Sequence, residues 1–263
     1  MSVVPVRAVE RTFKVLDILR QEGGSAGISM ISRKTGLPKS TIFRLLFTLS
    51  EIGVVHQDAS TDTYSLGFKL IELAFSAAKD WDIINLATPY LAKLRDEQQE
   101  TTALAIKIGI EYTFIAQAMC QHEYRVNPVL GERYKLHLAG TGKAILAYCP
   151  EDDVQQLMDI IPNTAATQFT IRDPIVLQNQ LKQIRQKGFA FSFSERIEGG
   201  ASFSAPVKDN LGFAQAAVSI IGPEVRLRKM DFLETGRAVA ETAKMLEMIY
   251  LTAGIKLENS LGK

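Results

Sequence analysis

Apolar residues in the first fifty positions recur at helical spacing in three short segments. The first segment predicts a helix over 6–22 that ends at two glycines, and the second predicts a helix over 29–35 with Ser29 as its N-cap. The third segment predicts a helix over 39–52. The apolar stripe of the first helix is Val9, Phe13, Leu16, Ile18 and Leu19, and the buried face of the third is Ile42, Leu45, Leu46 and Leu49.

A pair of alternating segments, 54–57 and 63–66, follows the third helix and predicts a β-hairpin. Two short helices joined by a glycine turn and followed by a hairpin are typical of a winged helix-turn-helix. The core pattern leaves the start of the third helix exposed, with side chains that can contact phosphates, base edges and thymine methyl groups. These side chains are Lys39, Ser40, Thr41, Phe43 and Arg44. A packing module without a role in DNA binding is the alternative.

The charge of the chain is divided unevenly between its two parts. The 263 residues carry a net charge of +1, but residues 1–50 contain eight Lys or Arg and three acidic residues, which leaves a net charge of −4 on the rest. A basic head on an acidic body favours the binding of a polyanion by the head. With 46% hydrophobic residues, the chain is long enough to bury a substantial core.

Several observations exclude a membrane or secreted protein. No apolar run approaches the roughly 18 residues needed to span a membrane. Charged residues interrupt the N-terminal segment, whereas a signal peptide needs an apolar stretch there. Two cysteines, Cys120 and Cys149, are too few for a disulfide framework. We therefore expect a soluble protein of the cytoplasm that makes no contact with membranes.

The second half alternates between strand and helix patterns. An amphipathic connector helix over 68–79 leads into it, and the expected domains are 1–67, a connector at 68–81, 82–254, and a tail at 255–263. Strands are predicted at 102–108, 112–118, 124–127, 189–193, 201–207 and 213–221, and helices from 82 and at 140–148, 151–159, 176–188 and 230–250. In the last helix, Leu233, Val239, Ala243 and Leu246 are expected to point inward. This order predicts an α+β domain with helices packed on an antiparallel sheet.

Two runs of sequence resemble the IclR family of bacterial transcription regulators. The first is GISMISRKTGLPKSTIFRLLFTLSEIGVVHQD, followed by Tyr64-Ser-Leu-Gly67, and the second is HLAGTGKAILA at 137–147. The resemblance implies an N-terminal winged helix and a C-terminal GAF-like effector domain. It also implies that Ser40, Thr41 and Arg44 contact the operator, with Phe43 at a variable position that sets specificity.

The segment Gly140-Thr141-Gly142-Lys143 is similar to a phosphate loop but lacks its pattern, since His137 stands where the first glycine is needed and Ala144 follows the lysine. A small-residue turn that opens a helix leaves backbone N–H groups free to receive an anion, such as the carboxylate of an effector. Close packing at the start of a helix is the alternative.

Serines cluster in the last strands and predict hydroxyl rows. Because residues i and i+2 face the same way on a strand, Ser192 pairs with Ser194, and Ser202 with Ser204. Hydroxyls among Phe and Ala suit a small, oxygen-rich ligand, although solvent-facing strand positions are also often serine. The resemblance implies that Gly140, Thr141, Ser192, Ser202 and Ser219 border the effector pocket, and many relatives carry an acidic residue where this chain has Ser192. Glu195 is interpreted as a structural acid at a strand end.

We expect a transcription regulator, of repressor type, that binds a palindromic operator as a homodimer or as a tetramer of two dimers. A small organic acid or sugar acid would control this binding. No enzyme, cofactor or metal is expected, since no G-x-S-x-G motif occurs and the three histidines lack a nucleophile at motif spacing. Two alternatives are a sensor whose basic domain docks a protein, and a metal-responsive regulator that uses Cys120 and His122.

Overall fold

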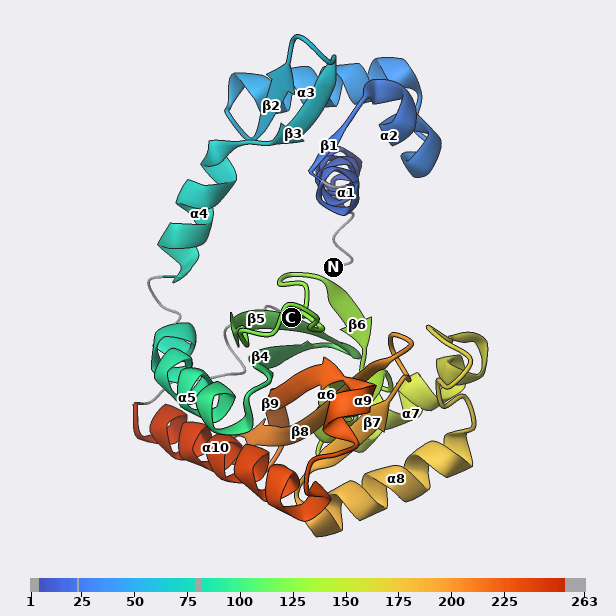
Figure 1. Cartoon of the computed structure of the whole chain (residues 1–263). Helices are drawn as coiled ribbons and strands as arrows, with labels where there is room; N and C mark the ends of the chain where they lie inside the picture. Colours follow the sequence, from blue (N-terminus) through green and yellow to red (C-terminus); the bar gives the residue numbers. More distant parts are fainter. Residues whose placement is uncertain (1–4, 23, 79–81, 254–263) are drawn as a thin grey trace. The chain divides into compact units, whose positions relative to one another are not determined.

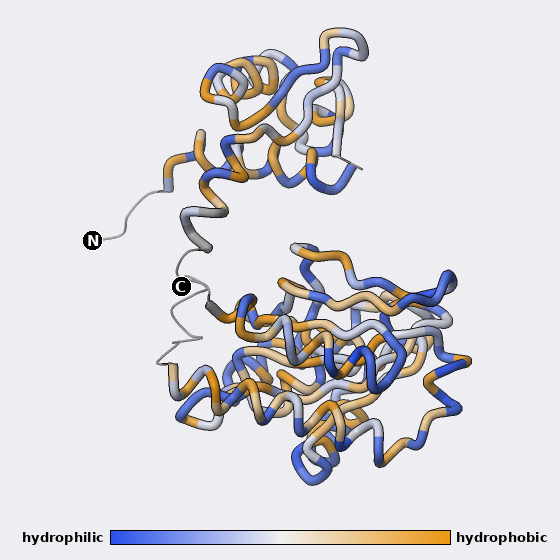
Figure 2. The backbone as a smooth tube through the Cα atoms, turned by 60° about the vertical axis from the view of Figure 1, so that its left-hand side comes forward, coloured by the Kyte–Doolittle hydropathy of each residue, from blue (hydrophilic) through white to orange (hydrophobic). Residues whose placement is uncertain are grey.

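The chain forms two compact units, residues 1–80 and 81–263. The computed structural model describes residues 5–22, 24–78 and 82–253. The division places the connector helix α4 (Phe68–Ala78) with the N-terminal unit. Within the described residues, no helix is both long and apolar enough to cross a membrane. Figure 2 shows hydrophilic and hydrophobic stretches following one another along the helices and strands of each unit.

The N-terminal unit is the predicted winged helix-turn-helix (Figure 1). Its other helices are α1 (Arg7–Gln21), α2 (Ile28–Thr35) and α3 (Lys39–Glu51). Its strands are β1 (Ser25–Ala26), β2 (Val55–Asp58) and β3 (Thr63–Leu66), in the order β1-β3-β2. The core consists of fully buried aliphatic side chains from all three helices: Val15, Leu19, Ile31, Ile42 and Leu46.

Three local features of this unit differ from the predictions. Strand β1 was not predicted, because two residues are too few to show a period. Helix α2 is capped by Gly27, whose extended backbone precedes the first turn, so Ser29 lies inside the helix. Of the predicted stripe on α1, Phe13 is 63% exposed. Val9 of the same stripe is 53% exposed. The helix buries Leu19, as expected, together with Val15, since these two meet the core of the unit.

The C-terminal unit is an antiparallel sheet with helices on both faces, which confirms the α+β prediction. Its strands are β4 (Thr101–Ile108), β5 (Glu111–Ala118), β6 (Arg133–Lys135), β7 (Ala190–Phe193), β8 (Gly200–Lys208) and β9 (Ala214–Pro223), in the order β6-β5-β4-β9-β8-β7. Its helices are α5 (Asp82–Gln98), α6 (Ala139–Leu146), α7 (Glu151–Ile160), α8 (Pro174–Lys187), α9 (Glu224–Leu227) and α10 (Phe232–Thr252), with a 3-10 turn at Ile161–Asn163.

Side-chain alternation gives the sheet two separate cores. Helices α5 and α10 cover one face, where Phe203 and Val218 are buried. Helices α6, α7 and α8 cover the other, where Ala105 and Ala217 are buried. Because successive residues on a strand point to opposite faces, a serine beside Phe203 must point towards α6. This rule positions the candidate site.

Three features of this unit differ from the predictions. The segment 124–127, predicted as a strand, is irregular, and β6 forms the sheet edge beside β5 instead. The short helix α9 was not predicted. In α10, Leu233 is exposed, while Val239, Ala243 and Leu246 point inward as expected. Leu233 lies in the first turn of α10, two residues after the Asp231 cap.

An aromatic cluster closes the face covered by α10. The Phe203 ring lies with its centroid 5.4 Å from that of Phe232 and 6.4 Å from that of Phe189. Phe191 and Phe193 contact the same ring. Phe203 is almost completely buried, so its ring is part of the core and has almost no contact with solvent.

We expect Phe203→Ala to lower the free energy of unfolding of the C-terminal unit by about 3–5 kcal/mol, because it removes a buried ring and leaves a cavity. Phe169→Ala is the matched control: its ring is 54% exposed, so the same change is expected to cost about 0.5 kcal/mol or less. Urea unfolding of both variants measures the difference. Equal losses would contradict the central position of Phe203.

Candidate nucleic-acid interface and effector pocket

Helix α3 presents one exposed face along its first two turns. Lys39, Ser40, Phe43 and Arg44 are exposed, whereas Thr41 is half-buried. The opposite face is anchored in the core of the unit. The turn before α3 is fixed by Gly36, whose φ of 71° ends α2, and by the Ser32 hydroxyl, which donates to the Leu37 carbonyl at 2.6 Å. The five predicted DNA-contacting residues therefore lie on one helix, and four of them are exposed.

The exposed face of α3 extends one turn further than predicted. Phe47 is 57% exposed, and its ring stacks on that of Phe43 with centroids 6.4 Å apart. The spacing of four residues between them was the available signal, since positions i and i+4 share a helix face. Exposing an aromatic ring to water is unfavourable in free energy unless a partner covers the ring. Thymine methyl groups are a suitable partner.

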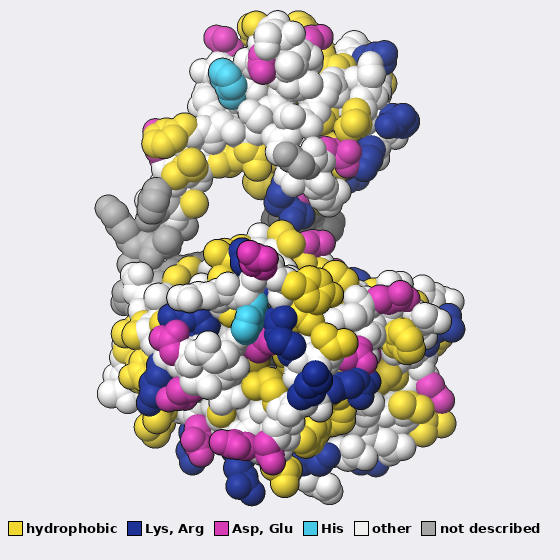
Figure 3. All heavy atoms as spheres, in the orientation of Figure 1, with side chains coloured by type: hydrophobic (Ala, Val, Ile, Leu, Met, Phe, Trp, Pro, Cys, Tyr) yellow, Lys and Arg dark blue, Asp and Glu magenta, His cyan; other side chains and the backbone are white. Residues whose placement is uncertain are grey.

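Positive charge on this unit is not neutralised at α3. Neither Lys39 nor Arg44 forms an ion pair with any residue that the structure describes. By contrast, Lys34 is paired with Glu22. Figure 3 shows Lys and Arg side chains of this unit gathered towards the side where Figure 1 places α2. Unpaired cations on an exposed helix suit a phosphate backbone.

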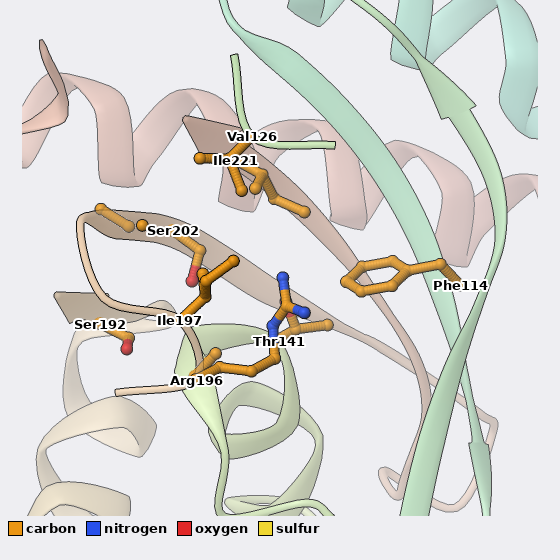
Figure 4. A pocket seen from close by; sticks show the side chains of 11 residues that line it. Phe114, Val126, Thr141, Ser192, Arg196, Ile197, Ser202 and Ile221 are labelled. Atoms are coloured by element: carbon orange, nitrogen blue, oxygen red, sulfur yellow. The ribbon is translucent and has the colours of Figure 1, made fainter. Parts of the chain in front are cut away.

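A pocket of about 310 Å³, including its open mouth, lies in the C-terminal unit between α6, the sheet and the 194–199 loop (Figure 4). Its walls combine apolar side chains with hydroxyl groups and one cation. The labelled lining residues are Phe114, Val126, Thr141, Ser192, Arg196, Ile197, Ser202 and Ile221. A mostly apolar cavity with a few polar groups is typical of small-molecule sites.

Four serines form a continuous row, here called the serine row, on the face of the sheet under α6. Strand register pairs Ser192 of β7 with Ser202 of β8, and Ser204 of β8 with Ser219 of β9. The hydroxyls of Ser204 and Ser219 lie 2.8 Å apart. The prediction that Ser202 and Ser204 share a face is confirmed by their common contact with α6.

Ser194, in contrast, does not extend the row. Its φ of 59° turns the chain out of β7. Its hydroxyl donates to the Glu224 carboxylate and accepts from the Gly199 N–H at 2.9 Å. The predicted pairing of Ser192 with Ser194 is therefore wrong, because the strand ends at Phe193.

The first turn of α6 packs directly on the serine row. The Gly140 N–H donates to the Ser202 hydroxyl at 3.1 Å, and the Thr141 hydroxyl lies 2.9 Å from that of Ser219. A Cβ on Gly140 would lie 2.9 Å from the Ser202 hydroxyl and 3.2 Å from the Ser202 carbonyl oxygen, so a larger residue here would require α6 or Ser202 to shift. The expectation that the Gly140 amide receives a carboxylate is not met, because the sheet already occupies it. Close packing explains this segment.

Of the five residues expected at the pocket, the structure brings three to its wall: Thr141, Ser192 and Ser202. Gly140 and Ser219 lie behind that wall, bonded to Ser202 and Thr141 respectively. Sequence reasoning did not single out Arg196 or the apolar lining residues. A lone arginine in a loop carries no periodic signal, so only the folded arrangement reveals it.

A buried ion pair joins α6 to the 194–199 loop. The Lys143 ammonium group lies 2.5 Å from the Glu195 carboxylate and also donates to the Gln180 side chain at 2.9 Å. Both side chains of the pair are almost inaccessible. Burial lowers the pKa of Lys143 and raises the pKa of Glu195, while their mutual attraction opposes both shifts. This geometry agrees with the structural interpretation of Glu195.

The residues of the metal-responsive alternative are not arranged as ligands. Cys120 is buried beside Thr101, whereas His122 is exposed, and both follow the end of β5. No group of three or more His, Cys, Asp or Glu side chains suited to a metal occurs in the part of the chain that the structure describes. Burial raises the pKa of the Cys149 thiol to about 12, so this thiol stays protonated at neutral pH.

Comparison with known proteins agrees with this arrangement. The family model of the IclR helix-turn-helix domain matches residues 8–59, and that of the bacterial transcriptional regulator IclR C-terminal domain matches 75–248. The chain is 34% identical over 242 residues to the HTH-type transcriptional repressor AllR of Salmonella paratyphi A, covering 90% of this chain and 88% of that protein.

Solved structures share the fold. An IclR transcriptional regulator from Alicyclobacillus acidocaldarius has a TM-score of 0.83 at 24% identity, over 93% of this chain and 99% of that one. An IclR homologue from Microbacterium hydrocarbonoxydans, solved with 4-hydroxybenzoate, has a TM-score of 0.80 at 20% identity, with the same coverage.

A winged helix-turn-helix with an exposed, basic helix face, joined to a pocketed sheet domain, defines a DNA-binding transcription regulator. The chain belongs to the IclR family of bacterial transcriptional regulators. Members of this family are regulators and not enzymes. The predictions of a DNA-binding regulator and of its family are confirmed.

We expect Lys143→Met to destabilise the C-terminal unit by about 3–5 kcal/mol, because it leaves the Glu195 carboxylate buried without its partner. The double variant Lys143→Met with Glu195→Leu should recover most of this loss, since a well-packed apolar pair can replace a buried ion pair. Urea unfolding of the single and double variants gives the coupling free energy. A double variant as unstable as the sum of the two single variants would contradict this interpretation.

Proposed function

We propose that this regulator is a repressor whose operator binding is controlled by a small organic acid held in the pocket of the C-terminal unit. In this proposal residues 1–67 bind DNA, 68–81 connect, and 82–254 bind the effector. The observation that carries the proposal is the coexistence of two recognition surfaces: an exposed, unpaired basic face on α3, and a pocket with hydroxyls and one guanidinium. The curated relatives are named as repressors.

Helix α3 would lie in the major groove, with Ser40, Phe43 and Arg44 at base edges and Lys39 at phosphates. Thr41, which is half-buried, would contact the DNA backbone near the start of the helix. A homodimer would present two such helices to half-sites about 10 base pairs apart, or a multiple of that distance. Such symmetry is what a palindromic operator requires.

The pocket suits a short acid with a second oxygen function. Its apolar walls would hold the carbon skeleton, while Ser192 and Ser202 would bind oxygens. The structural relative solved with 4-hydroxybenzoate is an example of this fold with a carboxylate ligand. To regulate, the acid must bind the DNA-competent and DNA-incompetent states with different affinities.

We expect Arg44→Ala to weaken binding to operator DNA selected in vitro from random sequence by about 1–3 kcal/mol, because it removes a base or key phosphate contact. Arg237→Ala removes the same charge from an exposed position on α10 and serves as the matched control. Fluorescence anisotropy at fixed salt measures both affinities. Unchanged operator affinity for Arg44→Ala would remove α3 from the interface.

A short monocarboxylate is expected to change operator affinity by about five- to 150-fold, which is the usual range of coupling between two sites. A mobility-shift assay with a panel of organic acids at constant ionic strength measures this effect, using the selected DNA and the DNA next to the coding sequence. If operator binding is selective but no acid changes the operator affinity, the protein is a regulator and the proposal of an acid effector is wrong. If no DNA is bound selectively, the protein-docking alternative replaces the proposal.

A further inference from the structure

Arg196 is the one cation among the described residues that line the pocket, and no carboxylate lines it. In Figure 4 the Arg196 side chain rises from its loop into the space between Ile197 and Phe114. The neighbouring Glu195 does not neutralise it, because that carboxylate is paired with Lys143. No described residue forms an ion pair with Arg196, although eleven other basic side chains among the described residues do form such pairs with acidic residues.

The loop that carries Arg196 is held rigidly. The Thr170 hydroxyl donates to the Glu195 carbonyl at 2.6 Å, and the Glu224 N–H donates to the Gly199 carbonyl at 2.7 Å. Ser194 and Gly199 both adopt positive φ angles, which close the loop on itself. The buried Lys143–Glu195 pair fixes the residue directly before Arg196. A ligand that binds Arg196 therefore does not have to order this backbone.

The guanidinium is also oriented before any ligand binds. Its carbon lies 4.6 Å from the centroid of the Tyr134 ring, which itself packs against Tyr112 and Phe114. Tyr134 engages part of the guanidinium through its ring face and a side-chain hydrogen bond, and the N–H groups that do not contact Tyr134 are left for a carboxylate. Arginine in this setting matches the two oxygens of a carboxylate in a bidentate geometry.

We infer that Arg196 binds the carboxylate of the effector, and that the pocket accepts monocarboxylates in preference to dicarboxylates and to neutral analogues. This inference rests on the proposed acid effector. One unpaired cation balances one negative charge, whereas a second carboxylate would be buried against Phe114, Ile197 and Ile221 without a partner. The volume of about 310 Å³ includes the open mouth, so the enclosed part of the pocket admits only a small ligand.

Isothermal titration of the full chain with lactate, pyruvate, glycerate, malonate and lactamide tests the inference. We expect at least one monocarboxylate to bind, with malonate and lactamide binding at least tenfold more weakly. Arg196→Gln should weaken binding of the tightest-binding monocarboxylate by about ten- to a hundredfold, the range for a hydrogen bond to a charged group. Arg196→Lys should give an intermediate loss, since lysine keeps the charge but not the planar donors.

Arg237→Gln is the matched control, because it removes a guanidinium from the exposed surface of α10. This variant should bind the acid with wild-type affinity. Circular dichroism melting of Arg196→Gln without acid checks that the variant is folded. Wild-type affinity in Arg196→Gln, or tighter binding of malonate than of any monocarboxylate, would overturn the assignment of Arg196.

The operator mobility shift separates this inference from the proposed function. If the same acid shifts the operator complex of Arg196→Gln and of the wild type at equal concentrations, the acid effector stands and the role of Arg196 is wrong. If no acid binds the wild-type protein or shifts its complex, both proposals are wrong. Loss of the shift in Arg196→Gln alone supports both.

Discussion

The close approach of α6 to the sheet is the constraint on which the C-terminal unit depends. Two small residues, Gly140 and Thr141, allow the first turn of the helix to bond directly to the hydroxyls of Ser202 and Ser219. The Gly140 N–H and the buried hydroxyls of Thr141, Ser202 and Ser219 satisfy one another, which removes the cost of burying each group alone. Larger residues on either side would separate the two layers.

This approach also determines where the pocket lies and how it is charged. With α6 held against the sheet, Lys143 reaches Glu195 in the buried interior and ties the following loop to the helix. The loop then carries Arg196 over the end of the serine row, with Tyr134 stacked on its guanidinium. The polarity of the pocket is thus a consequence of packing between elements that are distant in sequence.

The N-terminal unit has a smaller core, which leaves one face of α3 exposed. Its helices bury a single stripe each, and the remaining surface of α3 carries exposed cations and two stacked phenylalanine rings. Exposed apolar rings next to unpaired charges are costly on a free surface but suit a groove with phosphates on its rims and methyl groups on its floor. The same helix face therefore contributes both affinity and sequence preference.

Periodicity and local signals determined much of this protein from the sequence alone. The winged helix, the order of most strands and helices, the family, and the shared face of Ser202 and Ser204 follow from patterns of two to four residues, which depend on backbone geometry. Tertiary structure alone decided that the Gly140 amide is occupied, that Ser194 leaves its strand, and that Arg196 enters the pocket. These outcomes depend on partners more than twenty residues away, such as Ser202, Glu224 and Tyr134, and no local pattern specifies which of them a side chain will meet.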